Sequence, residues 1–268
     1  MSSLSVERRP DHAAGVKARL EEYYTRYYRD TLGIPQWRDL VDLRLGDHAY
    51  ESRRLTRLER LLARSVGGLS LLNIGCGPGG FNAVAQQAGA RAWGVDSSVE
   101  AVSIAAARVP GGRFLCADAM SLPFRDRRFD LVYCYSTLEH VADAGQVLRE
   151  IVRVLRPGGR LYLHAPNRWG CFEGHYKVLW APGLPRWLAR LYLAARGRPT
   201  GFLDRLRPVT LRGCRRLLEA AGARVTLVSN EDAHRPHGGP IWPLVRLYYR
   251  LFGVHPSVEL VAVSREDR

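Results

Sequence analysis

The spacing of hydrophobic residues changes near residue 68. From about residue 16 to residue 65, apolar side chains recur at the intervals of amphipathic helices. Leu55, Leu58, Leu61 and Leu62 lie at helical spacing, with arginines mostly elsewhere around the helix. Gly67 and Gly68 then mark the end of this pattern. Beyond them, short apolar runs alternate with helical segments. This alternation predicts an α/β fold with a mostly parallel sheet covered by helices on both faces.

Seven apolar runs are expected to form strands, and four segments between them are expected to form helices. The strands are expected at residues 69–74, 90–95, 113–116, 129–135, 160–165, 224–229 and 258–263. The helices are expected at residues 80–87, 99–108, 143–155 and 210–221. Residues 167–208 and 231–256 do not fit the alternation and are predicted to be insertions or lids. We therefore expect an N-terminal helical cap at residues 1–65 and one α/β domain at residues 66–268.

Composition and charge narrow the class of protein. The chain has 268 residues, 46% of them hydrophobic and 25% charged, which is typical of a soluble globular protein. The N-terminal residues carry Glu7, Arg8 and Arg9 and no apolar stretch, and no run approaches the ~18 residues needed to cross a bilayer. A cytoplasmic location is expected. The five cysteines never occur in CxxC spacing, so we expect reduced thiols and no metal site.

The net charge of +14 comes almost entirely from arginine. Residues 167–216 hold eleven basic side chains against Glu173 and Asp204. A codon preference explains an arginine bias equally well, but a positive surface in this segment would attract phosphates, anionic lipid head groups or nucleic acid.

The strongest local signal is a glycine-rich turn between a strand and a helix. It contains Gly75, Gly77 and Gly79, which let backbone amides approach a ligand without interference from a Cβ atom. Asp96 ends the next strand, where a carboxylate accepts hydrogen bonds from the ribose hydroxyls of an adenosine. The same pattern suits S-adenosylmethionine (SAM) and NAD, and Asp96 is also placed to cap the following helix. Asp118, at the end of the third strand, is a candidate to bind an adenine amino group.

Five blocks in this order resemble the motifs of class I SAM-dependent methyltransferases, and more narrowly those of the methyltransferase type 11 group. They are Asn-Ile-Gly-Cys-Gly-Pro-Gly at 73–79, Gly-Val-Asp at 94–96, Ala-Asp-Ala-Met-Ser-Leu-Pro-Phe at 117–124, Phe-Asp-Leu-Val at 129–132 with Leu-Glu-His-Val at 138–141, and Leu-Arg-Pro-Gly-Gly-Arg-Leu at 155–161. The resemblance covers about 100 residues. A dinucleotide dehydrogenase is not expected to show all five blocks.

This resemblance implies a doubly wound, Rossmann-like sheet of seven strands in the order 3-2-1-4-5-7-6, with strand 7 antiparallel. SAM would lie across the carboxyl ends of strands 1 to 4. By position, the glycine turn would contact the methionine part of SAM, the second block the ribose and the third block the adenine, while the end of strand 4 would lie near the sulfonium. The residues implied are Gly75, Cys76, Gly77, Gly79, Asp96, Ser97, Asp118, Ala119, Met120, Tyr135 and Ser136.

Two histidines are candidates for acid–base chemistry. SAM transfers its methyl group in line to a nucleophile, so the enzyme mainly aligns the reactants and excludes water. If the acceptor is a hydroxyl, its proton must be removed, and histidine suits that task near neutral pH. His140 follows strand 4 and His175 follows strand 5; a role in capping or packing is an equal alternative for His140. His164, His234 and His237 are expected to have no catalytic role.

The acceptor is expected to be a small, hydrophobic or lipid-like molecule, with O- or C-methylation favoured. Residues 184–192 and 241–252 both combine arginines with Trp, Tyr and Leu at helical spacing, which suits a substrate lid or a peripheral contact with a membrane. An RNA methyltransferase is the alternative suggested by the charge. However, no Asn/Asp-Pro-Pro-aromatic motif follows strand 4 and no cysteine follows a proline, so nucleic acid is not the expected substrate. A SAM-binding protein without catalysis is a third alternative.

Overall fold

Seven strands form one twisted sheet at the centre of the molecule. In the computed structural model, which describes residues 10–229 and 241–265, the strand order is β3-β2-β1-β4-β5-β9-β8. The strands are β1 (Ser70–Ile74), β2 (Arg91–Asp96), β3 (Arg113–Cys116), β4 (Phe129–Tyr135), β5 (Leu155–Pro166), β8 (Ala223–Val228) and β9 (Ser257–Ser264). β1 to β5 are parallel, and β9 runs antiparallel between β5 and β8. This confirms the predicted strand order and the antiparallel last strand.

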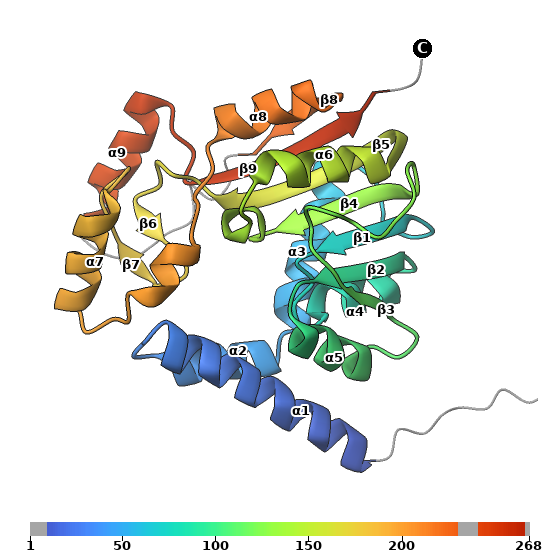
Figure 1. The fold of residues 1–268 in the computed structure, drawn as a ribbon, viewed down its shortest axis with the longest axis horizontal. Coiled ribbons are helices and arrows are strands. Elements are labelled where there is room, and N and C mark those ends of the chain that lie inside the picture. The colour runs from blue at the N-terminus through green and yellow to red at the C-terminus, as the bar shows by residue number, and fades with distance from the viewer. Residues whose placement is uncertain (1–9, 230–240, 266–268) are drawn as a thin grey trace, which may run out of the picture.

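Helices cover both faces of the sheet (Figure 1). One face packs against α3 (His48–Leu62) and α4 (Gly80–Gln87), through a core that includes Leu58, Leu62 and Phe81. The other face packs against α6 (Ala144–Val154) and α8 (Leu211–Ala220), through residues such as Leu148 and Leu218. α5 (Val99–Arg108) contacts β2 and β3. The apolar stripe of each helix is therefore buried against the sheet, as the spacing of its leucines and valines predicts.

The N-terminal helices and the insertion after β5 share a second, smaller core. The former are α1 (Pro10–Thr25), η1 (Arg26–Thr31) and α2 (Trp37–Leu45); the latter contains β6 (Phe172–Glu173), β7 (Val178–Leu179), α7 (Arg186–Ala195) and η3 (Gly201–Arg205). Tyr28, Leu32 and Val41 from the first group pack with Tyr176 and Leu193 from the second. The second insertion contributes α9 (Trp242–Phe252). His234 and His237 lie outside the described residues.

The observed elements differ from the expected ones mainly at their ends. β5 begins at Leu155 rather than at residue 160, because Leu155 already pairs with Phe129 before a register shift. The first helix begins at Pro10, ahead of the expected start near residue 16. All five cysteines are free thiols.

Candidate functional site

The glycine turn links the end of β1 to the start of α4 and lies against the end of β2. Gly75 and Cys76 donate their amides to the carbonyl of Val95 at 2.8 and 3.0 Å. Gly75, Gly77 and Gly79 all have positive φ angles, of 71°, 51° and 78°. Residues with a Cβ atom rarely adopt this conformation, so the turn needs glycine at all three positions.

The three glycines differ in what surrounds them. A Cβ atom on Gly75 would lie 2.0 Å from Oγ1 of Thr137, and one on Gly79 would lie 2.9 Å from Cβ of Ala105. A Cβ atom on Gly77 would meet no atom within 4 Å. Packing therefore adds to the requirement for glycine at positions 75 and 79, while Gly77 borders the open side of the turn, where a ligand can approach its backbone.

Asp96 holds the turn from the end of β2. Its Oδ2 accepts the amide of Gly77 at 2.8 Å, and its Oδ1 accepts the amide of Ser98 at 2.9 Å. The cap of α5 is Ser98, whose side chain accepts the amide of Ala101, so Asp96 is not the capping residue. An ionised carboxylate has about four acceptor positions, so Asp96 can accept two further hydrogen bonds, as the ribose of an adenosine requires. Ser97 is exposed next to it.

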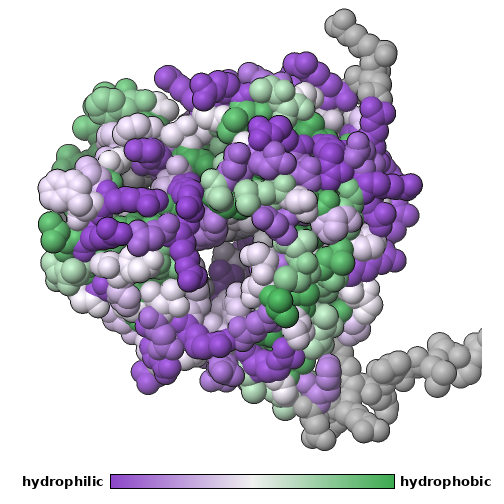
Figure 2. All heavy atoms as spheres, in the orientation of Figure 1, coloured by the Kyte–Doolittle hydropathy of each residue, from purple (hydrophilic) through white to green (hydrophobic). Residues whose placement is uncertain are grey.

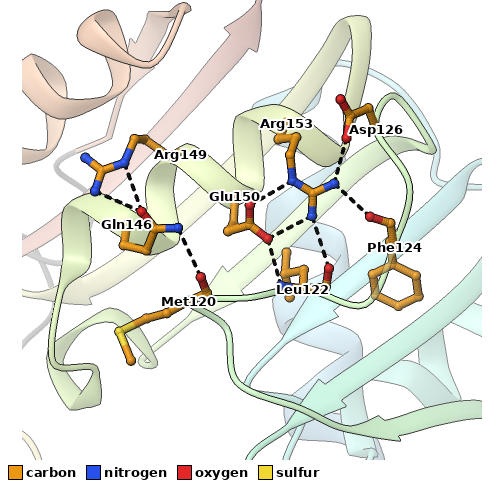
Figure 3. A network of polar contacts seen from close by, with 8 residues as sticks. All are labelled: Met120, Leu122, Phe124, Asp126, Gln146, Arg149, Glu150 and Arg153. Atoms are coloured by element: carbon orange, nitrogen blue, oxygen red, sulfur yellow. Dashed lines mark hydrogen bonds and ion pairs between the residues drawn. The ribbon is translucent and has the colours of Figure 1, made fainter.

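The loop after β3 carries Asp118, Ala119 and Met120. Oδ1 of the exposed Asp118 accepts the amide of Met120 at 2.8 Å, which closes a local turn. Figure 3 shows how α6 holds the rest of this loop: Arg153 donates to the carbonyls of Leu122 and Phe124. Gln146 donates to the carbonyl of Met120 at 3.1 Å. The segment predicted to contact adenine is therefore fixed by side chains of a neighbouring helix.

The end of β4 reaches the same edge of the sheet. Tyr135 stacks on His164 with ring centres 4.2 Å apart, and the guanidinium carbon of Arg54 lies 3.6 Å from the centre of its ring. Ser136 has a φ of 50°, a conformation that is unusual for serine and typical of functional turns. Thr137 follows and donates its hydroxyl to the carbonyl of Ile74 at 3.1 Å. The end of β4 thus contacts the glycine turn directly.

A residue that sequence analysis missed is Tyr23, in α1. Burial, and then the negative charges of Asp96 and Glu100, raise the pKa of Tyr23 to about 12. Four residues later, the pKa of Tyr27 is raised by burial, by Tyr28 and by Glu173. On the N-terminal helices, Tyr23 therefore lies near Asp96, and Tyr27, one turn later, lies near Glu173 of the insertion. In the sequence, the two pairs of tyrosines in Tyr-Tyr-Thr-Arg-Tyr-Tyr at residues 23–28 are the feature that could have identified this segment.

Both candidate histidines belong to one cluster. His140, in η2 (Leu138–His140), and His175, between β6 and β7, face each other with their Nε2 atoms 3.2 Å apart. Nδ1 of His175 is 2.7 Å from Oε1 of Glu173, and Phe202 of η3 lies beside both imidazoles. Oε1 of Glu139 lies 3.7 Å from Nε2 of His175 and 3.9 Å from Nε2 of His140.

Burial determines the charge of this cluster. The pKa of Glu139, only 1% exposed, is raised to about 7 by burial, and neither of its oxygens has a hydrogen-bond partner. Burial, and then His175, lower the pKa of His140 to about 4, so His140 is neutral at pH 7. Burial disfavours the charge of His175, but its hydrogen bond to Glu173 outweighs this effect and raises its pKa. A proton on the histidine pair is therefore held by His175, next to Glu173.

Residues 72–163 match a protein family described as a methyltransferase domain. The chain contains a class I methyltransferase domain. The matched segment includes the glycine turn, Asp96, the loop after β3 and His140. Such domains use SAM as the methyl donor, and the residues fit it: the turn leaves Gly77 open, and Asp96 has free acceptor positions for the ribose.

Known relatives resemble the chain over part of its length. A 27-O-demethylrifamycin SV methyltransferase from Amycolatopsis mediterranei is 34% identical over 157 residues, which are 49% of this chain and 56% of the relative. An O-methyltransferase, cnsE, from Penicillium expansum is 38% identical over 119 residues, 41% of this chain and 42% of the relative. The chain spans about half or less of the length of the curated relatives it matches.

A similar solved structure is that of the [4+2]-cyclase SpnF. It is 25% identical, with a TM-score of 0.54, over 80% of this chain and 82% of SpnF. The fold of this methyltransferase domain therefore also occurs in a protein named for a reaction other than methyl transfer.

Proposed function

We propose that this protein transfers the methyl group of SAM to a hydroxyl oxygen of a small, hydrophobic acceptor. The observation that supports the proposal best is the His140–His175 pair, 3.2 Å apart and backed by Glu173. His140 lies three residues after Thr137, which packs against Gly75 of the cofactor turn. The pair is therefore close to the place where the sulfonium would lie.

SAM, when bound, supplies an electrophilic methyl group, and the protein must position the acceptor and take up its proton. His140 is partly exposed and neutral at pH 7, but its lowered pKa makes it a weak base. A proton that it takes from a hydroxyl at one ring nitrogen is therefore passed on from Nε2, its other ring nitrogen, to Nε2 of His175. Nε2 of His140 faces His175, whose other ring nitrogen contacts the carboxylate of Glu173. A proton that reaches the pair is stabilised on His175 by this carboxylate, in the way that a buried carboxylate supports a histidine base.

The surroundings of the cluster favour an apolar acceptor. Figure 2 shows a hollow near the centre of the displayed face, between the insertion and the sheet, with a rim of mostly hydrophilic to intermediate residues. On the insertion side, Phe202 contacts both histidines, and Tyr27 contacts Phe202 with ring centres 5.8 Å apart. Aromatic side chains beside a small set of placed polar groups, here the two histidines and their carboxylates, are typical of pockets for hydrophobic small molecules.

Transfer to a hydroxyl is tested by incubating the protein with radiolabelled SAM and a panel of phenolic, quinol and polyketide alcohols. We expect methyl ethers, with turnover reduced about 10²–10⁴-fold by His140→Gln or His175→Gln, the range typical of a lost general base. His48→Gln is the matched control, because His48 is exposed and bonds only to side chains of α3 and α4. Products that carry the methyl group on carbon would contradict transfer to a hydroxyl and would identify a carbon atom as the acceptor. SAM binding without any turnover would favour a binding protein or, as for SpnF, another reaction.

A second proposal concerns contact with a membrane surface. α7 and α9 lie on the same side of the molecule (Figure 1) and leave large apolar side chains uncovered, among them Trp187 at 63% and Phe252 at 71% exposure. Helical spacing alone predicts one shared face for Trp187, Leu188, Leu191 and Tyr192. In the structure, α7 instead buries Ala189 and Leu193, and it leaves Trp187, Leu188 and Leu191 exposed. Arg190 and Arg250 lie on the same helices. Apolar side chains beside arginines suit the interface of an anionic bilayer.

Membrane contact is tested by co-sedimentation with vesicles of phosphatidylcholine and phosphatidylglycerol at low salt. We expect the protein to pellet, and the double variant Trp187→Glu/Phe252→Glu to remain in the supernatant. A variant of two exposed residues on α8 that lowers the net charge by the same amount, Arg212→Gln/Arg215→Gln, controls for charge alone. If the parent protein stays in solution, the membrane proposal is wrong. No helix in the described parts of the chain has the length and hydrophobicity to cross a bilayer.

A further inference from the structure

The buried carboxylate of Glu139 has no partner that satisfies it. Both of its oxygens are inaccessible to solvent and neither accepts a hydrogen bond. Its backbone carbonyl accepts the amide of Arg207 at 2.7 Å, so the main chain at Glu139 is fixed although the side-chain oxygens are not bonded. An ionised carboxylate in such a position is costly unless a cation or donors compensate it. Oε1 points toward the two Nε2 atoms of His140 and His175.

These three atoms have the spacing of a metal site. The sides of the triangle they form are 3.2 Å between the two nitrogens, and 3.7 and 3.9 Å from each nitrogen to Oε1 of Glu139. The point equidistant from the three atoms lies about 2.1 Å from each, which matches zinc–nitrogen and zinc–oxygen bonds of ~2.0–2.2 Å. All three ligand atoms can therefore bind one ion with little movement.

The surroundings also fit a metal ion. Glu173 accepts from Nδ1 of His175 at 2.7 Å, and its other oxygen accepts the amide of Tyr176 at 2.6 Å. A carboxylate behind a metal-binding histidine fixes the ring so that Nε2 faces the ion. Two imidazoles and one carboxylate favour zinc and similar first-row metals over magnesium or calcium. Cysteine spacing, the basis for expecting no metal site, tests only for thiolate ligands.

We infer that Glu139, His140 and His175 bind one divalent transition metal ion, with Glu173 as the group that orients His175. Three protein ligands leave a coordination position open, as in catalytic zinc sites. Ion binding is independent of the proposed methyl transfer. Only its role in the reaction rests on that proposal: the ion would lower the pKa of an acceptor hydroxyl that occupies the open position, and the imidazoles would then act as ligands instead of bases.

The inference is tested with the full-length, tag-free protein after treatment with a chelator. Calorimetric titration with Zn²⁺, Mn²⁺ and Mg²⁺ should give one site per chain, tightest for Zn²⁺. Co²⁺ should give visible absorption bands typical of a site with nitrogen ligands. Glu139→Gln and His175→Gln should abolish the site, and Glu173→Gln should weaken it about 10–100-fold, as for other groups that orient a metal ligand. His48→Gln is again the control and should bind as the parent does.

The result that overturns the inference is binding that survives Glu139→Gln and His175→Gln, or no binding by the folded parent protein. Circular dichroism shows whether each variant is folded, and the Co²⁺ spectrum of the parent needs no variant. S-adenosylhomocysteine (SAH) titrated into the same samples separates the two proposals. If SAH binds and the metal does not, only the metal inference is wrong. If the metal binds and SAH does not, the cofactor assignment is wrong.

Discussion

The backbone amide of Gly77 donates a hydrogen bond of 2.8 Å to Oδ2 of Asp96. This bond joins the turn after β1 to the end of β2, two elements that the resemblance assigns to different parts of SAM. Because Oδ1 also holds Ser98, one carboxylate fixes the geometry of the turn and the start of α5. The side chain expected to bind the ribose therefore also positions the turn expected to bind the methionine part.

Asp96→Ala should lower the affinity for SAH at least tenfold. The substitution removes hydrogen bonds to a charged group, each of which contributes ~1.5–3 kcal/mol, and ~1.4 kcal/mol corresponds to tenfold in affinity. Calorimetric titration measures the change. Asp130→Ala is the matched control, because Asp130 also accepts a backbone amide, from Ser70 at 2.8 Å, but at the amino end of the strands. Equal affinities of the parent protein and Asp96→Ala would show that the ribose binds elsewhere.

Gly75→Ala and Gly77→Ala should have separable effects. Both place a Cβ atom at a positive φ, which costs ~1–2 kcal/mol. Only Gly75→Ala also forces a clash with Thr137, so its melting temperature should fall further. Thr137→Ala, which removes the atoms at 2.0 and 2.7 Å, should restore part of that loss in the double variant. Gly77→Ala should instead mainly weaken SAH binding; the opposite ranking in thermal unfolding would contradict this distinction.

Tyr23→Ala should weaken SAH binding about fivefold to tenfold, a loss of ~1 kcal/mol that is common when an interface side chain is truncated. The reason is that α1 places Tyr23 near Asp96, where its ring would cover a cofactor whose ribose binds this carboxylate. Fluorescence or calorimetric titration measures the effect. Tyr248→Ala serves as control, since Tyr248, in the second insertion, donates its hydroxyl to the carbonyl of Trp169. An unchanged SAH affinity would mean that the N-terminal helices do not cover the cofactor.

Glu259→Gln should destabilise the protein by about 3–5 kcal/mol at pH 7, the cost of breaking a buried ion pair. Burial favours the neutral form of Glu259, but hydrogen bonds from Arg57, Ser229 and Tyr162 outweigh it and hold its pKa below the usual range. The stabilisation is therefore present above the unfolded pKa of ~4.3 and is lost as the pH falls through the folded pKa.

The pH dependence gives a second readout for the same residue. Denaturant unfolding between pH 3 and pH 7 should show a smaller dependence on pH for Glu259→Gln than for the parent protein. Asp204→Asn is the control, because the exposed pair Arg190–Asp204 should contribute no more than about 1 kcal/mol. Parallel curves for Glu259→Gln and the parent would contradict the assigned pKa.

The local order of residues determined the sheet and the cofactor turn. Strands β1 to β4 and helices α4 and α5 lie within a residue or so of their expected ends, because alternating apolar runs and helical spacing act over neighbouring residues. Gly75 to Gly79 and Asp96 were identifiable for the same reason, since a strand, a turn and a carboxylate at fixed spacing require specific residue types. These features follow from neighbouring residues and do not depend on contacts with distant parts of the chain.

Only the tertiary structure decided how the rest of the site is assembled. His140 and His175 were candidates singly, but their contact, and the positions of Glu139 and Glu173, join segments 35 residues apart. Tyr23 approaches Asp96 because the N-terminal helices pack against α5, where Arg26 pairs with Glu100 and Arg19 donates to Ser103. Such contacts leave no period in the sequence, since they depend on how separate elements pack and not on the residues next to each other.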